Sequence, residues 1–233
     1  MVTLSTKNAK DLDAPWRHWF FYGPTGSGKT TLAATFPRPV FIEPKNEGSV
    51  ETLRGLNIDY YEVVDLNSKI RNGVGGMNRI IAEIEGAYNA DPDAFPYDTI
   101  VIESMSHYTD LIIEDITAGG QDAMDQRKWG EVLAHIRNIQ TRLRNLDAHV
   151  VFTALEKIDE KTGEGLPLIQ GASAKKLPSS CDVIGFCEVI EAKNVIRYRT
   201  HFKPYRKYQA RSRIKGMPKV VDNFEFQKVA DLL

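Results

Sequence analysis

Residues 20–36 read FFYGPTGSGKTTLAATF, in which an apolar run, a glycine-rich turn and an apolar helical pattern follow one another. The central octet fits G-x-x-x-x-G-K-[ST] at every fixed position, beginning at Gly23 and ending at Lys29-Thr30. Glycines let successive backbone N–H groups face one point, and the start of a helix adds its dipole to that anion site. The stretch therefore predicts a phosphate-binding loop between a strand and a helix.

The two residues that close the octet have distinct chemical roles. The Lys29 ammonium group reaches the β- and γ-phosphates of a nucleoside triphosphate, and the Thr30 hydroxyl can bind Mg²⁺. We therefore predict that the chain binds ATP together with Mg²⁺. The predicted nucleotide-binding residues are Gly23, Pro24, Thr25, Gly26, Ser27, Gly28, Lys29, Thr30 and Thr31.

The composition is that of an ordinary globular protein. The chain has 233 residues, of which 42% are hydrophobic and 26% charged, and this length suits one large domain. It has neither an apolar run that could cross a membrane nor the apolar core of a secretory signal. Because only Cys181 and Cys187 are present, we expect a reducing, cytoplasmic setting without disulfides.

The charge is unevenly distributed along the chain. The net charge is −1, yet residues 192–221 carry ten lysines and arginines and no acidic residue. One basic segment on an otherwise acidic chain indicates a local anionic partner. Tyr198, Tyr205 and Tyr208 are interleaved with these cations, which makes the segment a candidate for nucleic-acid binding.

Strand and helix patterns alternate from the phosphate loop to Leu155, which predicts an α/β fold with a mostly parallel central sheet and helices on both faces. Residues 156–180 are predicted to form a long polar loop. Two apolar runs after it predict a C-terminal antiparallel hairpin. Strands are predicted at 16–22, 39–43, 58–64, 97–104, 149–155, 182–190 and 195–202, and helices at 29–36, 75–88, 108–116 and 129–146.

Acidic residues follow two of the predicted strands. Glu103 follows the four residues TIVI, at a strand end where a phosphate-loop enzyme needs an acid to hold Mg²⁺. Thr30 and Glu103 therefore form the predicted metal site. Glu43 and Glu47 follow the second strand, and either could orient an attacking water, because neighbouring strands end on the same rim. Glu43 ends its strand directly and is the first choice, although both could be surface acids. The predicted catalytic residues are Lys29, Glu43, Glu47 and Glu103.

With these parts assembled, the chain resembles the RecA-like ATPases carried by phages, in particular those described as phage AAA-type ATPases or RecA-like single-strand annealing proteins. The resemblance covers the chain from about Trp19 to Leu233 and is carried by GPTGSGKTTLA, YDTIVIES, HVVFTALEKIDEKTGEG, SSCDVIGFCEV and YQARSRIKGMP. It implies a RecA-like P-loop core that binds ATP between the subunits of a ring or filament. It also implies action on single-stranded DNA in homologous recombination, by annealing or strand exchange, in the host cytoplasm.

The resemblance also implies an arginine that acts in trans. In related proteins a K-x-R pair after the core sheet reaches the γ-phosphate bound by the neighbouring subunit. Arg211-Ser212-Arg213 stands at this place, with arginine in place of lysine and one extra residue before Gly216. Either Arg211 or Arg213 could be this finger, which would make hydrolysis depend on an oligomer.

The same family uses the loop after the core strand to contact DNA. The predicted contacts there are Lys157, Lys161, Lys175 and Lys176, and Arg127 and Lys128 lie in a second candidate loop. The loop over 156–180 has no aromatic residue for base stacking. We expect one domain over residues 19–233, preceded by a segment, residues 1–18, that could pack on a neighbouring subunit.

Two other functions use the same phosphate loop. A small-molecule or nucleotide kinase would need an arginine-bearing lid, and residues 156–180 contain no arginine. A non-hydrolysing, nucleotide-gated assembly protein would lack a catalytic base, and the choice between Glu43 and Glu47 leaves that alternative open. The C-terminal hairpin and the Arg-x-Arg motif favour the DNA-acting ATPase.

Overall fold

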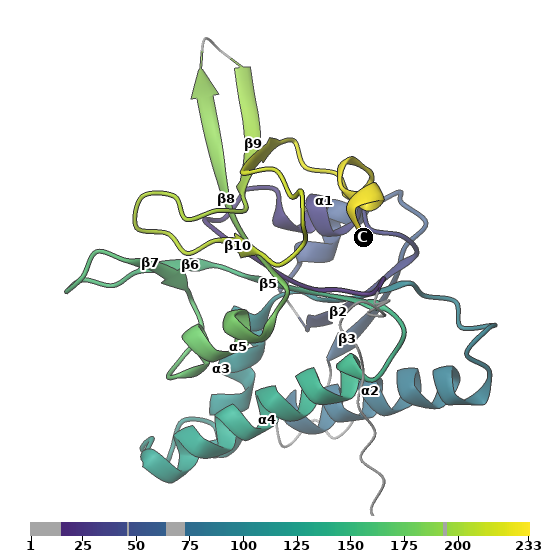
Figure 1. Ribbon diagram of the computed structural model, residues 1–233. Coiled ribbons are helices and arrows are strands. Elements are labelled where there is room, and N and C mark those ends of the chain that lie inside the picture. Colours follow the sequence, from purple (N-terminus) through teal and green to yellow (C-terminus); the bar gives the residue numbers. More distant parts are fainter. Residues whose placement is uncertain (1–14, 46, 64–72, 193–194) are drawn as a thin grey trace, which may run out of the picture.

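The computed structural model describes residues 15–45, 47–63, 73–192 and 195–233. Its centre is a twisted sheet with the strand order β11-β9-β8-β1-β5-β4-β2-β3, in which the short β10 also pairs with β8 (Figure 1). The parallel strands are β1 His18–Tyr22, β2 Pro39–Pro44, β3 Asp59–Val63, β4 Thr99–Ile102, β5 His149–Ala154 and β8 Val183–Ala192, which pairs with β1.

The antiparallel part of the sheet lies beyond β8. β9, Val195–His201, pairs antiparallel with β8 from Phe186 onward, and β11, Val220–Asp222, pairs antiparallel with β9. β10, Arg211–Ser212, pairs with the opposite, amino-terminal end of β8. The prediction of a mostly parallel sheet with a C-terminal antiparallel hairpin is therefore confirmed.

Alternation along β1 separates two hydrophobic cores. Phe20 and Tyr22 face the core under the long helices α2 Gly73–Ala90, α3 Met105–Ile116 and α4 Gln126–Arg144. Trp19 and Phe21 face the other core, which contains α1, Lys29–Ala33, and the C-terminal residues. Three 3₁₀ turns complete this second layer: η2 Ser49–Leu53, η3 Phe226–Lys228 and η4 Ala230–Leu232. Helices thus cover both faces of the sheet, as Figure 1 shows.

The region after Leu155 and the end of α1 differ from the sequence-based prediction. The predicted long loop over 156–180 contains a two-stranded hairpin, β6 Glu156–Ile158 with β7 Gly165–Pro167, and a helix, α5 Ser173–Ser180. Strands of three residues are too short to produce a readable alternation, which is why the prediction was wrong. α1 ends at Ala33 instead of Phe36, because the N–H groups of Thr35 and Phe36 donate to the carbonyl oxygens three residues back, of Leu32 and Ala33, instead of four.

Of the predicted N-terminal segment 1–18, residues 1–14 lie outside the described residues. No helix in the described part of the chain is long and apolar enough to span a bilayer.

Candidate nucleotide-binding site

The phosphate loop joins the carboxyl end of β1 to the start of α1. Gly28 has a φ of 81°, in the left-handed region that favours glycine. A Cβ on Gly23 would lie 2.0 Å from the Cys187 carbonyl oxygen, so only glycine lets β8 approach the loop this closely. Backbone geometry therefore requires both of these motif glycines.

Lys29 is buried within the loop, with 7% of its surface exposed. Its Nζ donates to the carbonyl oxygens of Gly23 at 3.1 Å and Pro24 at 2.8 Å. Burial lowers the pKa of Lys29, whereas the nearby Glu103 carboxylate raises it. The ammonium group is held where phosphate oxygens could replace the carbonyl oxygens as charged, stronger acceptors.

Glu103 follows β4 and is almost completely buried, with 3% of its surface exposed. Burial is the main cause that raises the pKa of Glu103 to about 7; the Glu47 carboxylate adds to this effect and Lys29 opposes it. Among the described residues, Glu103 Oε2 has no hydrogen-bond partner, although buried polar atoms are normally bonded. A free carboxylate oxygen with Thr30 nearby fits Mg²⁺, which prefers hard oxygen ligands.

Glu43 and Glu47 have different surroundings. Glu43 Oε2 accepts hydrogen bonds from the Ser49 hydroxyl at 2.8 Å and from the Val50 backbone N–H at 3.2 Å. Glu43 therefore caps the start of η2, and it is not among the residues that line the cleft before the phosphate loop. Glu47 does line this cleft, beside Glu103. Of the two acids, Glu47 is the one whose carboxylate faces the predicted nucleotide site.

Two further residues, which the sequence did not single out, hold Glu47. Its Oε2 accepts from the Ser104 backbone N–H at 3.0 Å, and its Oε1 lies 2.9 Å from His107 Nδ1. Ser104 Oγ also lies 3.2 Å from the same His107 nitrogen. Their one feature in the sequence is that a serine and a histidine stand three residues apart where the predicted strand ends and the helix begins. Ser104 and His107 both line the cleft.

The far wall of the cleft comes from the C-terminal part of the chain. Alternate residues of β9, Ile196, Tyr198 and Thr200, face the cleft together with Asn223. The Tyr198 ring lies so close to Gly28 that a Cβ there would be 3.1 Å from the ring. Two hydrogen bonds join Asn223 to the backbone of Tyr198. The Asn223 N–H donates to the Tyr198 carbonyl oxygen at 2.6 Å, and Asn223 Oδ1 accepts from the Tyr198 N–H at 3.1 Å. The cleft encloses about 1150 Å³, a size that accommodates a nucleotide.

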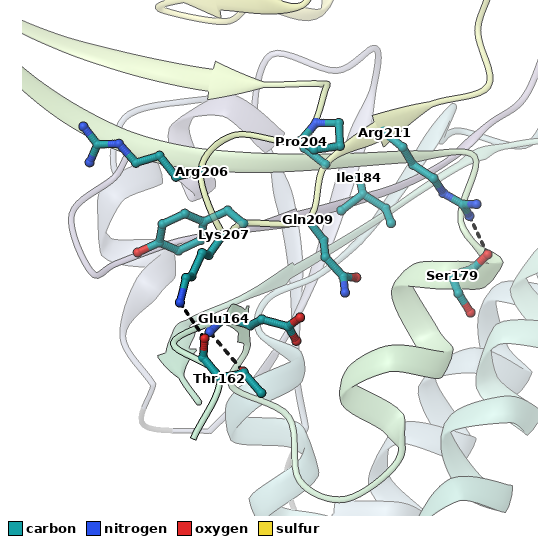
Figure 2. Close-up of a pocket in the computed structure, with 11 residues that line it drawn as sticks. Thr162, Glu164, Ser179, Ile184, Pro204, Arg206, Lys207, Gln209 and Arg211 are labelled. Carbon is teal, nitrogen blue, oxygen red and sulfur yellow. Dashed lines mark hydrogen bonds between the residues drawn. The ribbon is translucent and has the colours of Figure 1, made fainter. Parts of the chain in front are cut away.

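The lysines predicted to contact DNA lie in the β6–β7 hairpin and in α5. Lys161 and Lys176 are exposed, and Lys175 Nζ lies 3.9 Å from Glu164. Lys157 Nζ donates to the Ile169 carbonyl oxygen at 3.3 Å. The hairpin contributes one side of a second pocket, which Figure 2 shows.

The two predicted contacts near α4 differ in exposure. Arg127 is exposed and lies 3.3 Å from Glu131 one turn further along the helix. Lys128 is 8% exposed, and its Nζ donates to the Ala123 carbonyl oxygen at 3.0 Å. Lys128 is therefore occupied within its own chain.

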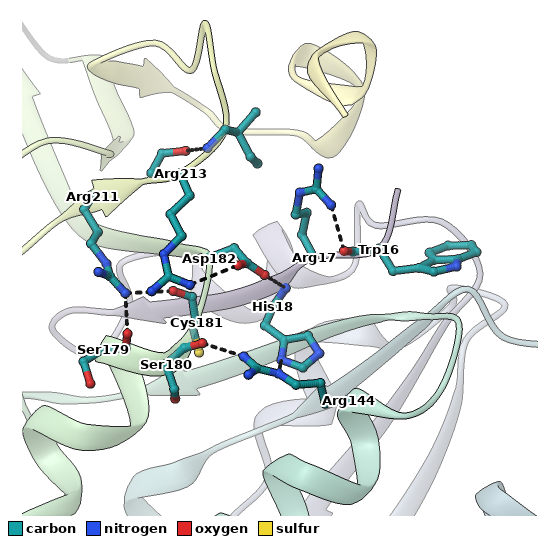
Figure 3. Close-up of polar contacts among 12 residues, drawn as sticks. Trp16, Arg17, His18, Arg144, Ser179, Ser180, Cys181, Asp182, Arg211 and Arg213 are labelled. Atoms are coloured by element: carbon teal, nitrogen blue, oxygen red, sulfur yellow. Dashed lines mark hydrogen bonds and ion pairs between the residues drawn. The ribbon is translucent and has the colours of Figure 1, made fainter. Parts of the chain in front are cut away.

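Arg211 and Arg213 lie at the amino end of β8, away from the phosphate loop of the same chain (Figure 3). Arg211 Nη2 donates to the carbonyl oxygens of Ser179 and Cys181. Arg213 Nη1 lies 3.4 Å from Asp182 Oδ1, and 54% of the Arg213 side chain is exposed. Arg211 is thus anchored to neutral acceptors, and Arg213 extends further into solvent.

A phosphate loop after the first strand of a mostly parallel sheet, with a buried acid after β4, which β5 separates from that first strand, defines a P-loop nucleoside triphosphatase. Residues 16–214 match the model of the family described as the AAA domain, and the chain belongs to this family of nucleotide-binding ATPases. A comparison with curated proteins gave no significant match.

Proposed function

We propose that this protein is a Mg²⁺-dependent ATPase that acts on single-stranded DNA. The observation that carries the ATPase part is the convergence of Lys29, Glu103 and Glu47 on one cleft at the carboxyl ends of β1, β2 and β4. Phosphoryl transfer requires positioning and electrostatic stabilisation more than covalent chemistry. These side chains supply both.

Each side chain has a part in the proposed reaction. Lys29 binds the β- and γ-phosphates in place of its present carbonyl acceptors. Thr30 and Glu103 would hold Mg²⁺, which neutralises charge on the phosphates when it is bound. Glu47 orients the attacking water and accepts its proton, with Ser104 and His107 fixing the carboxylate.

The release of inorganic phosphate tests this function against its alternatives. The wild-type protein should convert ATP to ADP and free phosphate with Mg²⁺ and no added acceptor. A kinase would instead require an acceptor molecule. A nucleotide-gated assembly protein would bind ATP tightly, measured by calorimetry, and release no phosphate.

The proposed oligomer rests on where the two arginines lie. β8 runs parallel to β1, so Val183 at the amino end of β8 pairs with Trp19, whereas the phosphate loop follows the far end of β1. Arg213 at that amino end serves the nucleotide of a neighbouring subunit in a ring or filament. Mixing Glu47→Gln and Arg213→Ala subunits tests this directly. At some interfaces, the intact Glu47 of an Arg213→Ala subunit then meets the intact Arg213 of a Glu47→Gln subunit.

Hydrolysis should therefore reappear on mixing. A mixture whose rate is only the sum of the rates of the two separate variants would contradict an arginine that acts in trans.

The DNA part of the proposal is supported by the exposed lysines around the β6–β7 hairpin and by the resemblance to RecA-like annealing proteins. The ATP-bound form would bind single-stranded DNA tightly, and hydrolysis would release the DNA. This cycle would serve annealing or strand exchange. Addition of single-stranded DNA should raise the rate of phosphate release. A rate that DNA does not change at any protein concentration would contradict this part alone.

A further inference from the structure

A second pocket, of about 600 Å³, lies between the β6–β7 hairpin, the end of α5 and the loop that precedes β10. Thr162 and Glu164 line one side and Ser179 another; Lys207 points toward Thr162 and Arg211 toward Ser179, whereas the Arg206 side chain extends outward at the rim (Figure 2). The lining residues Ile184 and Ala210 belong to the core beneath α3–α5, so this pocket and α1 lie on opposite faces of the sheet.

The three basic side chains of this pocket contact carbonyl oxygens or an aromatic ring instead of carboxylates. Lys207 Nζ donates to the Thr162 carbonyl oxygen at 2.6 Å, and Arg211 donates to two carbonyl oxygens. Within the described part of the chain, none of Arg206, Lys207 and Arg211 forms an ion pair with a carboxylate. Glu164, the one acid of the lining, lies 3.9 Å from Lys175 Nζ. The pocket is therefore net positive and suits an anion.

The aromatic residues beside the pocket are already covered. The Tyr208 ring stacks on Phe186 with centroids 3.7 Å apart, and a Cβ on Gly165 would lie 2.1 Å from the same ring. Tyr205 stacks on His201 at 3.9 Å, and the Arg206 guanidinium lies 5.1 Å from the Tyr205 centroid. Neither ring offers a face on which a base could stack, so the pocket fits phosphate and does not read the base.

The pocket is joined to the nucleotide cleft by two short connections. Tyr22 is the last residue before the phosphate loop, and its hydroxyl group donates to the carbonyl oxygen of Gln209 at 2.8 Å. The carbonyl oxygen of Gly165 lies 3.4 Å from the same hydroxyl oxygen. Leu155 lines the nucleotide cleft, and β6 begins at the next residue. The two walls of the pocket are thus fixed to the strands that carry the ATP site.

From this we propose that the pocket binds the phosphate backbone of a single-stranded nucleic acid without regard to sequence. The inference rests on the proposed function and names the surface that would hold the strand. Arg206 and Lys207, two exposed residues of the lining, are the phosphate contacts. Each phosphate contact with a single strand contributes roughly 0.7 to the slope of log affinity against log salt concentration.

The test measures binding of a labelled oligothymidine by fluorescence anisotropy at several salt concentrations. Arg206→Glu and Lys207→Glu should each weaken binding roughly tenfold, equally for oligothymidine and oligoadenosine, and lower the salt slope by about 0.7. The matched control is Lys215→Glu, which makes the same charge change at an exposed lysine that does not line the pocket. Calorimetric ATP binding should be unchanged in all three variants, which shows that they are folded.

The outcomes separate this inference from the proposed function. Oligothymidine binding that is strong in the wild type and equal in Arg206→Glu, Lys207→Glu and Lys215→Glu overturns the pocket and leaves the DNA-acting ATPase in place. A wild type that hydrolyses ATP but binds no strand overturns both the DNA part of the function and the pocket. If thymidine monophosphate binds as tightly as the oligothymidine, and this binding is lost in Arg206→Glu and Lys207→Glu, the pocket is a site for free nucleotides and the proposal is overturned.

Discussion

Glu47, in the loop after β2, meets His107, in the first turn of α3, with Glu47 Oε1 2.9 Å from His107 Nδ1. The other carboxylate oxygen accepts from the Ser104 N–H at 3.0 Å, so both oxygens are held by the residues that begin α3. A carboxylate fixed in this way keeps one orientation in front of the buried Glu103. The arrangement suits a base that must meet a water molecule at a defined position.

Glu47→Gln should abolish most hydrolysis and leave ATP binding intact. Loss of a general base lowers kcat by about 10²–10⁴-fold, whereas the phosphate contacts through Lys29 remain. Phosphate release measures the first effect and calorimetry the second. Glu43→Ala is the matched control, because Glu43 caps η2. It should lower stability by about 1 kcal/mol in chemical denaturation and leave kcat unchanged. The reverse result would make Glu43 the base.

Stabilisation by Mg²⁺ should increase from pH 6 to pH 8 when nucleotide is present. The pKa of Glu103 is raised to about 7, so the carboxyl group is mostly protonated below this pH and cannot bind the metal. The measurement is the change in melting temperature on adding Mg²⁺ to the nucleotide-bound protein. Glu103→Gln should show a small Mg²⁺ effect at both pH values. An equal Mg²⁺ effect at both pH values in the wild type would exclude Glu103 as a ligand.

The same carboxyl group should act in the opposite direction on the protein without Mg²⁺. The folded-state pKa lies above its ordinary value of 4.5, so between these values the folded protein binds more protons at Glu103 than the unfolded chain. The contribution of Glu103 to stability therefore falls as the pH rises from about 4.5 to about 7. The difference between wild type and Glu103→Gln in urea denaturation isolates this contribution from other groups. A difference that does not change with pH would contradict the raised pKa.

Arg211→Ala and Arg213→Ala should have different consequences. Arg211 donates to the carbonyl oxygens of Ser179 and Cys181, and its removal leaves them without these bonds, which costs about 1–3 kcal/mol of stability. Arg213 is half exposed at its contact with Asp182, so its removal should change the melting temperature little and reduce hydrolysis about 10³-fold or more. Melting curves and phosphate release distinguish the two. A stable Arg211→Ala variant without activity would assign the finger to Arg211.

Tyr198→Ala should weaken ATP binding several-fold and have less effect on kcat. The Tyr198 ring closes the cleft over Gly28 and contributes apolar contact area to a bound nucleotide. Tyr198→Phe retains the ring and should bind ATP like the wild type. Calorimetric titration with a non-hydrolysable ATP analogue provides the comparison. Identical affinities for the alanine and wild-type proteins would remove Tyr198 from the nucleotide site.

The phosphate loop and the sheet could be predicted because their signals are local. The spacing of Gly23, Gly28 and Lys29 follows from the backbone geometry of the loop itself. The strand runs are continuous and apolar because helices cover both faces of a parallel sheet. The hairpin of β8 and β9 could be predicted from two runs rich in β-branched and aromatic residues that are close together in the sequence.

The choice of base and the far wall of the cleft depend on contacts that are distant in sequence. Glu43 is the last residue but one of β2, which ends at Pro44 instead of at Glu43 as predicted, and its carboxylate accepts hydrogen bonds from Ser49 and Val50 at η2. Tyr198 reaches Gly28 only because β9 folds back beside β8 across the sheet. No pattern within a short window records either contact, so the sequence could not select Glu47 or Tyr198.

The Tyr22 hydroxyl joins the end of β1 to the carbonyl groups of Gln209 and Gly165. If nucleotide at the phosphate loop changes the affinity of the second pocket by some factor, a strand in that pocket must change nucleotide affinity by the same factor. Such reciprocity makes each ligand a regulator of the other. The hydroxyl group of Tyr22 would then couple the binding of nucleotide to the binding of the strand.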